Sequence, residues 1–427
     1  MINLYSFILG HSAKLSQAEI ESVLKYKNID FQITEMNDIF LILETKVLLD
    51  IEELNSTLGG IIKIGKLEFF IDKLSNEENL VSFFKEILKK NSDLENKIKF
   101  GFSVYSSDEF LQKFVFKLAL SIKKSLKGEK ISSRVVTSKE KNLSAVIVEK
   151  EHLISSGFDM QVLKIEKRYY FFRTLAVQDF TRFNALDYDR PRVDSKSGMM
   201  PPKLAKIMLN LVDKKGVILD PFCGSGTILL MAAELGFQKI IGSDISEKAV
   251  LDSQKNLKWY VERFNRSLDS LCSLGTFRKV DNYIFQSDVK NLFHPSTSSG
   301  PSGGIEKNSI NCIVSEGYLG QPLRGHEDFS FIQNQISDLS DLYLGSFKVF
   351  KDLLKIGGCV IITLPIFVIN DNSPRFAGEA RENHLEILDQ IKNLGFQIKS
   401  LLENQETLIY KREGQRVYRN VIKFVKK

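Results

Sequence analysis

Residues 217–227 read Val217-Ile218-Leu219-Asp220-Pro221-Phe222-Cys223-Gly224-Ser225-Gly226-Thr227, and they decide the fold class of the C-terminal half of this chain. An apolar run that predicts a buried strand ends in a carboxylate, a turn of small residues follows, and the apolar stretch 228–234 predicts a helix. Gly224 and Gly226 are expected where a Cβ would block the close approach of a ligand or the required backbone angles. In a parallel sheet, such a turn lies at the carboxyl edge, where ligands bind.

Two familiar glycine-rich loops do not match this turn. A P-loop would need Gly-Lys-Ser/Thr to meet a triphosphate, and a dinucleotide loop would need G-x-G-x-x-G. Here Gly224-Ser225-Gly226 is followed by Thr227-Ile228-Leu229. The whole run favours a ligand site of another kind over a tight turn with only a structural role.

Two more acidic residues end the strands expected next. Asp244 comes close to the roughly 20-residue offset after Asp220 at which a carboxylate meets ribose hydroxyls. Asp288 ends the third strand, where its carboxylate could accept from an adenine amino group. Together they predict a nucleoside lying across three strand ends. The predicted ligand-binding residues are Asp220, Phe222, Cys223, Gly224, Ser225, Gly226, Asp244, Ile245, Asp288 and Val289.

Strands and helices alternate regularly through residues 186–427, which predicts an α/β domain with a mostly parallel sheet covered on both faces. The strands are expected at 216–220, 240–244, 283–287, 310–314 and 359–364, with a closing antiparallel group at 396–402, 407–411 and 417–424. The Ser- and Gly-rich stretch 294–309 interrupts this order and predicts a disordered surface insertion, because it is too polar to bury itself.

The N-terminal part reads as two smaller α+β stretches, 1–60 and 61–172, followed by a polar linker at 173–185. In the second stretch, strands are expected at 100–105 and 145–149 around a helix at 109–127. This region is rich in cations, and its candidate nucleic-acid contacts are Lys113, Lys117, Lys123, Lys124 and Arg134. The alternative is a solvated helix face.

Composition sets further limits. The formal net charge is +6 and the hydrophobic fraction is 43%, as in an ordinary globular protein. No stretch approaches the roughly 18 apolar residues that cross a membrane, and the first residues do not predict a signal peptide. Four scattered cysteines and five histidines without a ligand pattern predict a reducing, cytoplasmic location and no metal. Without heptads, a monomer is expected.

Residues 220–227 resemble motif I of the methyltransferases that act on amino groups of nucleic acids. The wider chain is similar to the THUMP-containing tRNA guanosine N2-methyltransferases of the guanosine-10 type. That similarity is carried by Phe7-Ile8-Leu9-Gly10 with 15–21, Asp187-Tyr188-Asp189-Arg190-Pro191 with 197–205, and 410–415. The resemblance implies S-adenosylmethionine as cofactor and tRNA as partner. It also implies a ferredoxin-like start, a THUMP domain over 61–172 that makes RNA binding the preferred role of the cationic region, and a Rossmann-like class I domain with a seven-stranded sheet.

The chain departs from the family where the fourth strand ends. The family has Asp-Pro-Pro-Tyr-Gly or a close variant, whereas this chain has Val314-Ser315-Glu316-Gly317-Tyr318-Leu319-Gly320. One register places Glu316 at the acid position, and a register shifted by one places Ser315 there. The first is preferred because it keeps a carboxylate and the last glycine. Glu316 is then the predicted acceptor for a guanine amine, and Tyr318 the predicted stacking partner of the base.

With Gly317 in place of a proline, this loop is expected to be less rigid than in the family. No cysteine follows Glu316 in the loop, which argues against the thiolate chemistry of pyrimidine C5 methylation. Two alternatives stay open. One is a DNA adenine-N6 or cytosine-N4 methyltransferase, since these share motif I. The other is an RNA-binding protein that binds the cofactor but has lost turnover.

Overall fold

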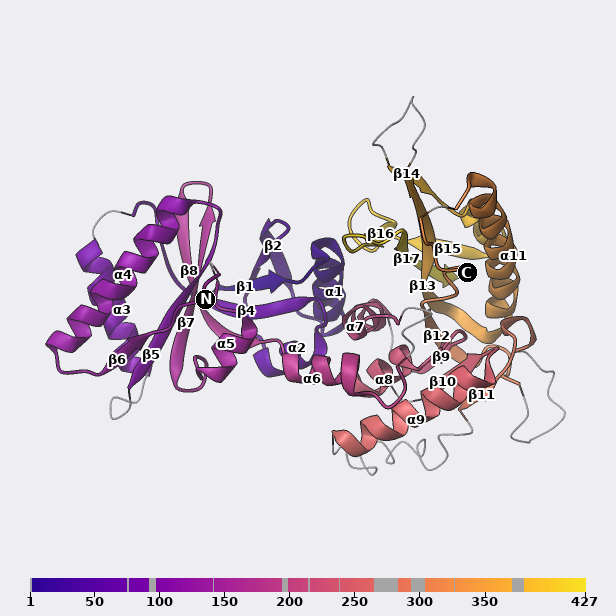
Figure 1. Ribbon diagram of the computed structural model, residues 1–427, viewed down its shortest axis with the longest axis horizontal. Coiled ribbons are helices and arrows are strands. Elements are labelled where there is room, and N and C mark those ends of the chain that lie inside the picture. The colour runs from indigo at the N-terminus through magenta and orange to yellow at the C-terminus, as the bar shows by residue number, and fades with distance from the viewer. Residues whose placement is uncertain are drawn as a thin grey trace. The chain divides into compact units, whose positions relative to one another are not determined.

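The computed structural model describes residues 2–74, 77–91, 97–140, 142–193, 199–213, 216–237, 239–264, 283–292, 304–325, 327–370 and 380–427. The chain forms two compact units (Figure 1). Unit 1 contains Met1–Ala13 and Asn28–Arg182, and unit 2 contains Lys14–Lys27 and Phe183–Lys427. The first helix, α1 (Ala13–Tyr26), therefore belongs almost entirely to unit 2, although the strands on either side of it belong to unit 1.

Unit 1 is built on one sheet. Its strands are β1 (Asn3–Leu9), β2 (Phe31–Met36), β3 (Phe40–Thr45), β4 (Ile61–Ile71), β5 (Ile98–Tyr105), β6 (Ser133–Val135), β7 (Gly157–Ile165) and β8 (Arg168–Val177). They lie in the order β2-β3-β1-β4-β8-β7-β5-β6. The first three come from residues 1–60, so the two α+β stretches of the sequence share a single eight-stranded sheet. The end of β8 reaches into the stretch expected to be a linker.

The helices of unit 1 are α2 (Ile51–Thr57), α3 (Glu77–Asn91), α4 (Glu109–Gly128) and α5 (Ala145–Lys150) among the residues described. Helix α4 begins where the Asp108 carboxylate accepts hydrogen bonds from the backbone N–H groups of Phe110 and Leu111. Its buried residues recur at three- and four-residue steps and pack with α3 against the sheet (Figure 1). These residues are Leu111, Val115, Leu118, Ala119, Ile122 and Leu126.

The expectation of a strand at 145–149 is wrong, because this stretch forms α5. The Ser144 hydroxyl accepts from the backbone N–H of Ile147 and starts the helix. Only Val148 in it is fully buried. A short apolar run cannot distinguish strand from helix by its pattern, and here the cap decides.

Unit 2 contains the α/β domain expected from the sequence. Its strands are β9 (Val217–Asp220), β10 (Lys239–Asp244), β11 (Ile284–Gln286), β12 (Ile310–Ser315), β13 (Leu354–Asn370), β14 (Ala380–Asn383), β15 (Phe396–Lys399), β16 (Thr407–Tyr410) and β17 (Val417–Lys426). Seven follow the order β11-β10-β9-β12-β13-β17-β15. Strands β14 and β16 pair beside this path, so the described sheet has nine strands rather than the seven expected. Pairing is parallel from β11 to β13 and antiparallel beyond it.

Both faces of this sheet are covered, as the apolar strands require. Ile218 packs into one core, while its neighbour Leu219 packs into the other. The first core is covered by α1, α7 (Pro202–Asn210), α8 (Thr227–Glu234) and α9 (Glu247–Arg263). The second is covered by α11 (Phe329–Leu353) and α12 (Leu388–Asn393). Because β9, β10, β11 and β12 run parallel to one another, their carboxyl ends lie at the same edge of the sheet.

The chain enters unit 2 through α6 (Phe180–Asn184) and a short π-helix, η1 (Ala185–Asp189). Residues 294–303 of the expected disordered insertion lie outside the described residues. Its last part is ordered: Ile305 is buried, and its backbone N–H donates to the carbonyl of Leu292 at 2.9 Å. Among the described helices, none has the length and apolar character that crossing a bilayer demands.

Candidate active site

The turn between β9 and α8 has the backbone that its glycines suggested. Gly224 and Gly226 adopt φ values of +50° and +87°, the left-handed region that glycine tolerates best. At Gly226 a Cβ would lie 2.5 Å from the Ser253 hydroxyl. At Gly224 a Cβ would meet nothing within 4 Å, so the turn is open there to a ligand. Such a cradle fits the nucleoside part of S-adenosylmethionine.

Asp244 links the end of β10 to this turn. Its Oδ2 accepts from the backbone N–H of Gly224 at 3.0 Å, and its Oδ1 accepts from the N–H of Ser246 at 2.9 Å. The carboxylate is only partly buried, which leaves it within reach of a ligand on the turn. The next side chain, Ile245, is 69% exposed.

The third strand end is arranged differently. Asp288 is partly buried and accepts from the backbone N–H of Lys290 at 2.9 Å, which caps the 3-10 helix η3 (Val289–Asn291). The Val289 side chain is buried in the core beneath α11. Of the ten predicted ligand-binding residues, Val289 can therefore offer a ligand only its backbone.

Asp220 is buried at the centre of the site. Its Oδ1 accepts from the Ser315 hydroxyl at 2.7 Å and from the backbone N–H of Phe222 at 3.2 Å. Burial, which outweighs these hydrogen bonds, raises the pKa of Asp220 to about 7, and the charges of Asp244 and Glu316 act in the same direction.

Glu316 reaches the same pocket from the end of β12. This pocket is lined by Met199, Met200, Asp220, Phe222, Cys223, Gly224, Ser225, Thr227, Ile228 and Glu316. The guanidinium Nε of Arg419, on β17, donates to Glu316 Oε1 at 2.6 Å. Burial raises the pKa of Glu316, and the positive charge of Arg419 opposes that rise. The side chain of Ser315, the acid position in the shifted register, is fully buried and bound to Asp220 instead.

The loop after β12 is held by two buried hydroxyls. The Thr363 hydroxyl donates to the carbonyl of Glu316, and the Tyr343 hydroxyl donates to the carbonyl of Tyr318 at 2.9 Å. Gly317 adopts φ +69°, and a Cβ there would collide with the Tyr343 hydroxyl. The carbonyls of Glu316 and Tyr318 therefore have hydrogen-bond partners in this loop, and the lower rigidity expected from Gly317 stays a prediction. The Tyr318 side chain itself is half exposed and lies outside the pocket lining described.

Cys223 is a buried packing residue of the turn. Burial raises the pKa of its thiol well above its ordinary value, as it does for Cys312 and Cys359. All three are free thiols, while Cys272 lies outside the described residues. In the described part of the chain, no group of three or more His, Cys, Asp or Glu side chains is placed to hold a metal ion.

Arg190 and Asn256, which are distant from the glycine turn in the sequence, hold it through hydrogen bonds that the sequence did not predict. Arg190 is 3% exposed, and its guanidinium donates to the Thr227 hydroxyl at 2.8 Å. Asn256, on the buried face of α9, donates to the carbonyls of Ser225 at 2.9 Å and Arg192 at 2.8 Å. For Arg190, the only signal in the sequence was the Asp-Arg-Pro-Arg run at 189–192. For Asn256 and for Arg419, a polar residue within an otherwise buried pattern was the available hint.

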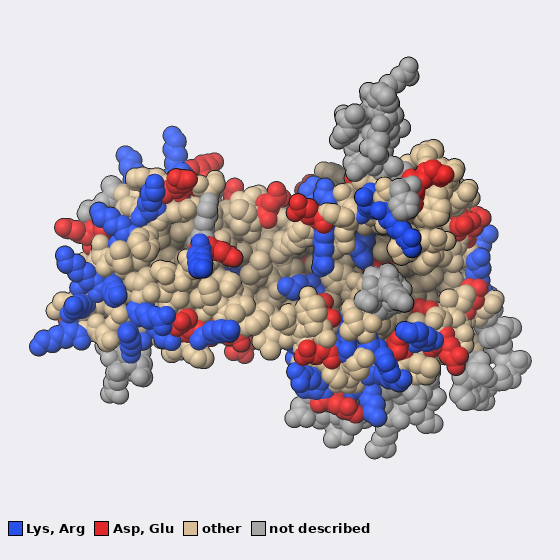
Figure 2. All heavy atoms as spheres, viewed as in Figure 1, with Lys and Arg blue, Asp and Glu red and all other residues tan. Residues whose placement is uncertain are grey.

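The predicted RNA contacts lie in unit 1, where lysines and arginines gather over the surface (Figure 2). Four of them are exposed on α4: Lys113, Lys117, Lys123 and Lys124. Lys117 pairs with Glu77 at 2.9 Å, and Arg134, on β6, pairs with Glu151 at 3.3 Å. Lys113 lies 4.0 Å from Glu109.

Comparisons with known proteins agree with this fold. A family model described as DNA methylase matches residues 63–255. The crystal structure of TrmN from Thermus thermophilus superposes with a TM-score of 0.54 and 14% identity over 100% of both chains. At that identity the likeness shows the fold alone.

Curated relatives are similar over shorter stretches. The tRNA (guanine(10)-N2)-dimethyltransferase of Methanothermobacter thermautotrophicus is 40% identical over 99 residues, 22% of this chain and 29% of that one. The first three curated relatives are matched over 29%, 25% and 32% of their length. The protein of Methanothermococcus thermolithotrophicus named Probable tRNA (guanine(10)-N2)-dimethyltransferase is 45% identical over 130 residues, 27% of this chain and 76% of that one. Because 76% of that relative is matched at 45% identity, the chain belongs to the family of the tRNA (guanine(10)-N2)-dimethyltransferases.

Proposed function

We propose that this chain transfers a methyl group from S-adenosylmethionine to the exocyclic N2 of a guanosine in tRNA, of the position-10 type. One observation carries the proposal: the Glu316 carboxylate lines the same pocket as the glycine turn after β9. Methyl donor and acceptor amine can thus meet at neighbouring strand ends. The names of the curated tRNA-modifying relatives support the choice of acceptor.

The donor side is built for a nucleoside. When bound, S-adenosylmethionine supplies a methyl group already activated by its positive sulfonium. The open turn at Gly224 lets backbone approach the ligand, and the partly exposed Asp244 carboxylate accepts from ribose hydroxyls. Arg190 and Asn256 hold the turn in place, so orientation is set before the ligand arrives.

The acceptor side must compensate for a weak nucleophile, because the guanine amine shares its lone pair with the ring. Glu316 accepts a hydrogen bond from that amine and stabilises the positive charge that develops on nitrogen. Arg419 fixes the direction of the carboxylate, and burial makes Glu316 more basic than a surface glutamate. Tyr318, half exposed, stacks on the base after it leaves its helix.

We assign RNA binding to unit 1, with residues 1–60 as a ferredoxin-like part, 61–172 as a THUMP-like part and 173–185 as the connection to the methyltransferase domain at 186–427. The exposed cations of α4 support this assignment, and Lys123 and Lys124 have no ion-pair partner among the described residues. Free, buried thiols in the described chain support a cytoplasmic, reducing setting. We propose action as a monomer.

A second candidate is methylation of adenine N6 or cytosine N4 in DNA. The match to a model described as DNA methylase favours it. Both reactions need an acceptor side chain beside an exocyclic amine, so the pocket supports either. The third possibility is cofactor binding without turnover.

Methyl transfer from labelled S-adenosylmethionine decides among these. Unmodified tRNA transcripts and duplex DNA are offered separately, and digested nucleosides are separated. We expect N2-methylguanosine from tRNA alone. The deoxynucleosides N6-methyldeoxyadenosine or N4-methyldeoxycytidine from DNA would favour the second candidate, and cofactor binding with no product the third.

Two variants test the role of the pocket carboxylate. Glu316→Gln should bind the cofactor normally and lose turnover, because a neutral amide stabilises less positive charge. Glu403→Gln, at an exposed carboxylate, is the matched control and should behave as the wild type. Full activity in Glu316→Gln would remove this residue from the reaction.

A further inference from the structure

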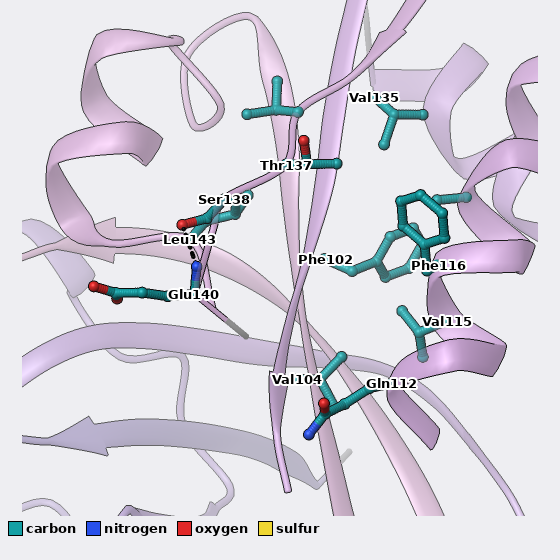
Figure 3. A pocket seen from close by; sticks show the side chains of 12 residues that line it. Phe102, Val104, Gln112, Val115, Phe116, Val135, Thr137, Ser138, Glu140 and Leu143 are labelled. Carbon is teal, nitrogen blue, oxygen red and sulfur yellow. Dashed lines mark hydrogen bonds between the residues drawn. The ribbon is translucent and has the colours of Figure 1, made fainter. Parts of the chain in front are cut away.

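A cavity of about 170 Å³ lies in unit 1, between α4 and the strands β5 and β6 (Figure 3). It is lined by Phe102, Val104, Gln112, Val115, Phe116, Ala119, Val135, Val136, Thr137, Ser138, Glu140 and Leu143. A buried water needs roughly 15 Å³ of such space, so the cavity holds on the order of ten non-hydrogen atoms. One nucleobase has that size.

The inner part of the cavity is apolar and includes aromatic rings. Val104, Val115 and Leu143 line it and are themselves buried. Phe116 reaches from α4 toward the strands and is nevertheless 55% exposed (Figure 3). An exposed phenyl ring at the rim of such a cavity offers a face on which a base can stack.

The outer part of the cavity is polar. Gln112 comes from α4, whereas Thr137, Ser138 and Glu140 come from the segment after β6 (Figure 3). The exposed Glu140 carboxylate repels a phosphate but accepts hydrogen bonds from base amino groups. This lining therefore suits a nucleobase rather than the sugar-phosphate backbone of a nucleic acid.

A lysine that can bind a phosphate of the nucleic acid lies next to the cavity-lining residues on α4. On α4 the lining residues Gln112, Phe116 and Ala119 form one stripe, which Lys123 continues one turn later. Lys123 is exposed and has no ion-pair partner among the described residues. A phosphate next to the inserted base would meet its ammonium group.

We infer that this cavity receives one unpaired nucleobase of the RNA substrate, stacked on Phe116, while Lys123 binds an adjoining phosphate. The identity of that RNA as the methylated one rests on the proposed function. The charge around the cavity favours RNA over an apolar peptide, which would leave Lys123 unused.

Fluorescence anisotropy of the full chain with two labelled RNA hairpins tests this. One hairpin is fully paired, and the other carries a short unpaired extension. Wild type should prefer the extended hairpin. Phe116→Ala should weaken its binding by about 5- to 150-fold, the range for loss of one stacked base, and should leave the paired hairpin unaffected. Phe110→Ala, at a ring that is also exposed on α4 but lies outside the cavity lining, should change neither affinity by more than about twofold.

Lys123→Gln should weaken both hairpins and make the dependence of log affinity on log salt shallower by about one. Equal affinity of wild type for the two hairpins, binding to neither, or equal effects of Phe116→Ala and Phe110→Ala overturns the inference. Phe116-dependent binding without methylated guanosine would instead refute only the proposed function. Methylation that is indifferent to Phe116 would refute only the cavity's role.

Discussion

Replacement of Asp220 by asparagine should remove a distinct pH dependence from the stability of unit 2. The folded-state pKa of this carboxyl is about 7, against 3.8 ordinarily, because burial disfavours its charged form. A raised acid pKa gives stability that is fully present below pH 3.8 and is lost as pH rises through 7. Asparagine cannot ionise, so its variant lacks that loss.

The magnitude follows from the width of this window. The full shift of about three pKa units corresponds to about 4 kcal/mol, and the part lost between pH 5 and pH 8 is about 3 kcal/mol. The asparagine oxygen can still accept from Ser315 and Phe222, although its new N–H groups need partners and cost about 1–3 kcal/mol at every pH. That constant cost cancels when the two pH values are compared.

Urea unfolding followed by tryptophan fluorescence measures the effect. The chain has one tryptophan, Trp259, on α9 and packed against the core of unit 2, so its signal reports this unit. Titrating groups without an electrostatic coupling to Asp220 contribute equally to both proteins; Asp244 and Glu316 are coupled to it. Between pH 5 and pH 8, wild type should lose about 3 kcal/mol more than Asp220→Asn. Parallel stability profiles for the two proteins would refute the assignment of a buried, protonated Asp220.

Three further substitutions probe the pocket. Asp244→Ala should weaken S-adenosylmethionine binding about 100-fold or more in titration calorimetry, since charged hydrogen bonds to the ribose contribute about 1.5–3 kcal/mol each. Unchanged affinity would contradict the proposed role of Asp244 in cofactor binding. Gly226→Ala should lower the melting temperature more than Gly236→Ala, because both glycines have positive φ but a new Cβ meets atoms within 4 Å only at Gly226. Equal falls in melting temperature would argue against a steric clash with Ser253 at the turn. Tyr343→Phe should reduce kcat about tenfold with cofactor affinity intact, because the Tyr318 carbonyl loses its partner; a wild-type kcat would show that this contact does not position the loop.

The donor half of the site was predictable because it is local. The strand ending at Asp220, the glycine turn and the helix from Thr227 are consecutive, so hydrophobic pattern and backbone chemistry both identify them. The same logic placed Asp244 at a strand end. Val289 shows the limit, since a residue's distance from a strand end does not tell whether its side chain enters the core.

The acceptor half depends on contacts between distant residues, so the sequence predicted Glu316 and Tyr318 but not the side chains that hold them. Glu316 and Arg419 are brought together because β13 pairs with β12 on one side and with β17 on the other. Tyr343 lies in the amphipathic helix α11, but a helical pattern does not show that its hydroxyl holds the loop of Tyr318. The short strand β14 also lies beyond what the pattern predicted, whereas β16 falls within the strand expected at 407–411.

The assignment of α1 to unit 2 has a consequence for synthesis of the chain. Leu15 and Ala18 belong to the core of unit 2, and Glu19 accepts from the Asn210 side chain at 2.7 Å. The ribosome makes this helix first, and its native neighbours on α7 emerge only after about 190 more residues, roughly 10–40 seconds later at ordinary elongation rates. During that interval the apolar face of α1 is without its native contacts, and a nascent chain halted before α7 is the species most exposed to chaperones and proteases.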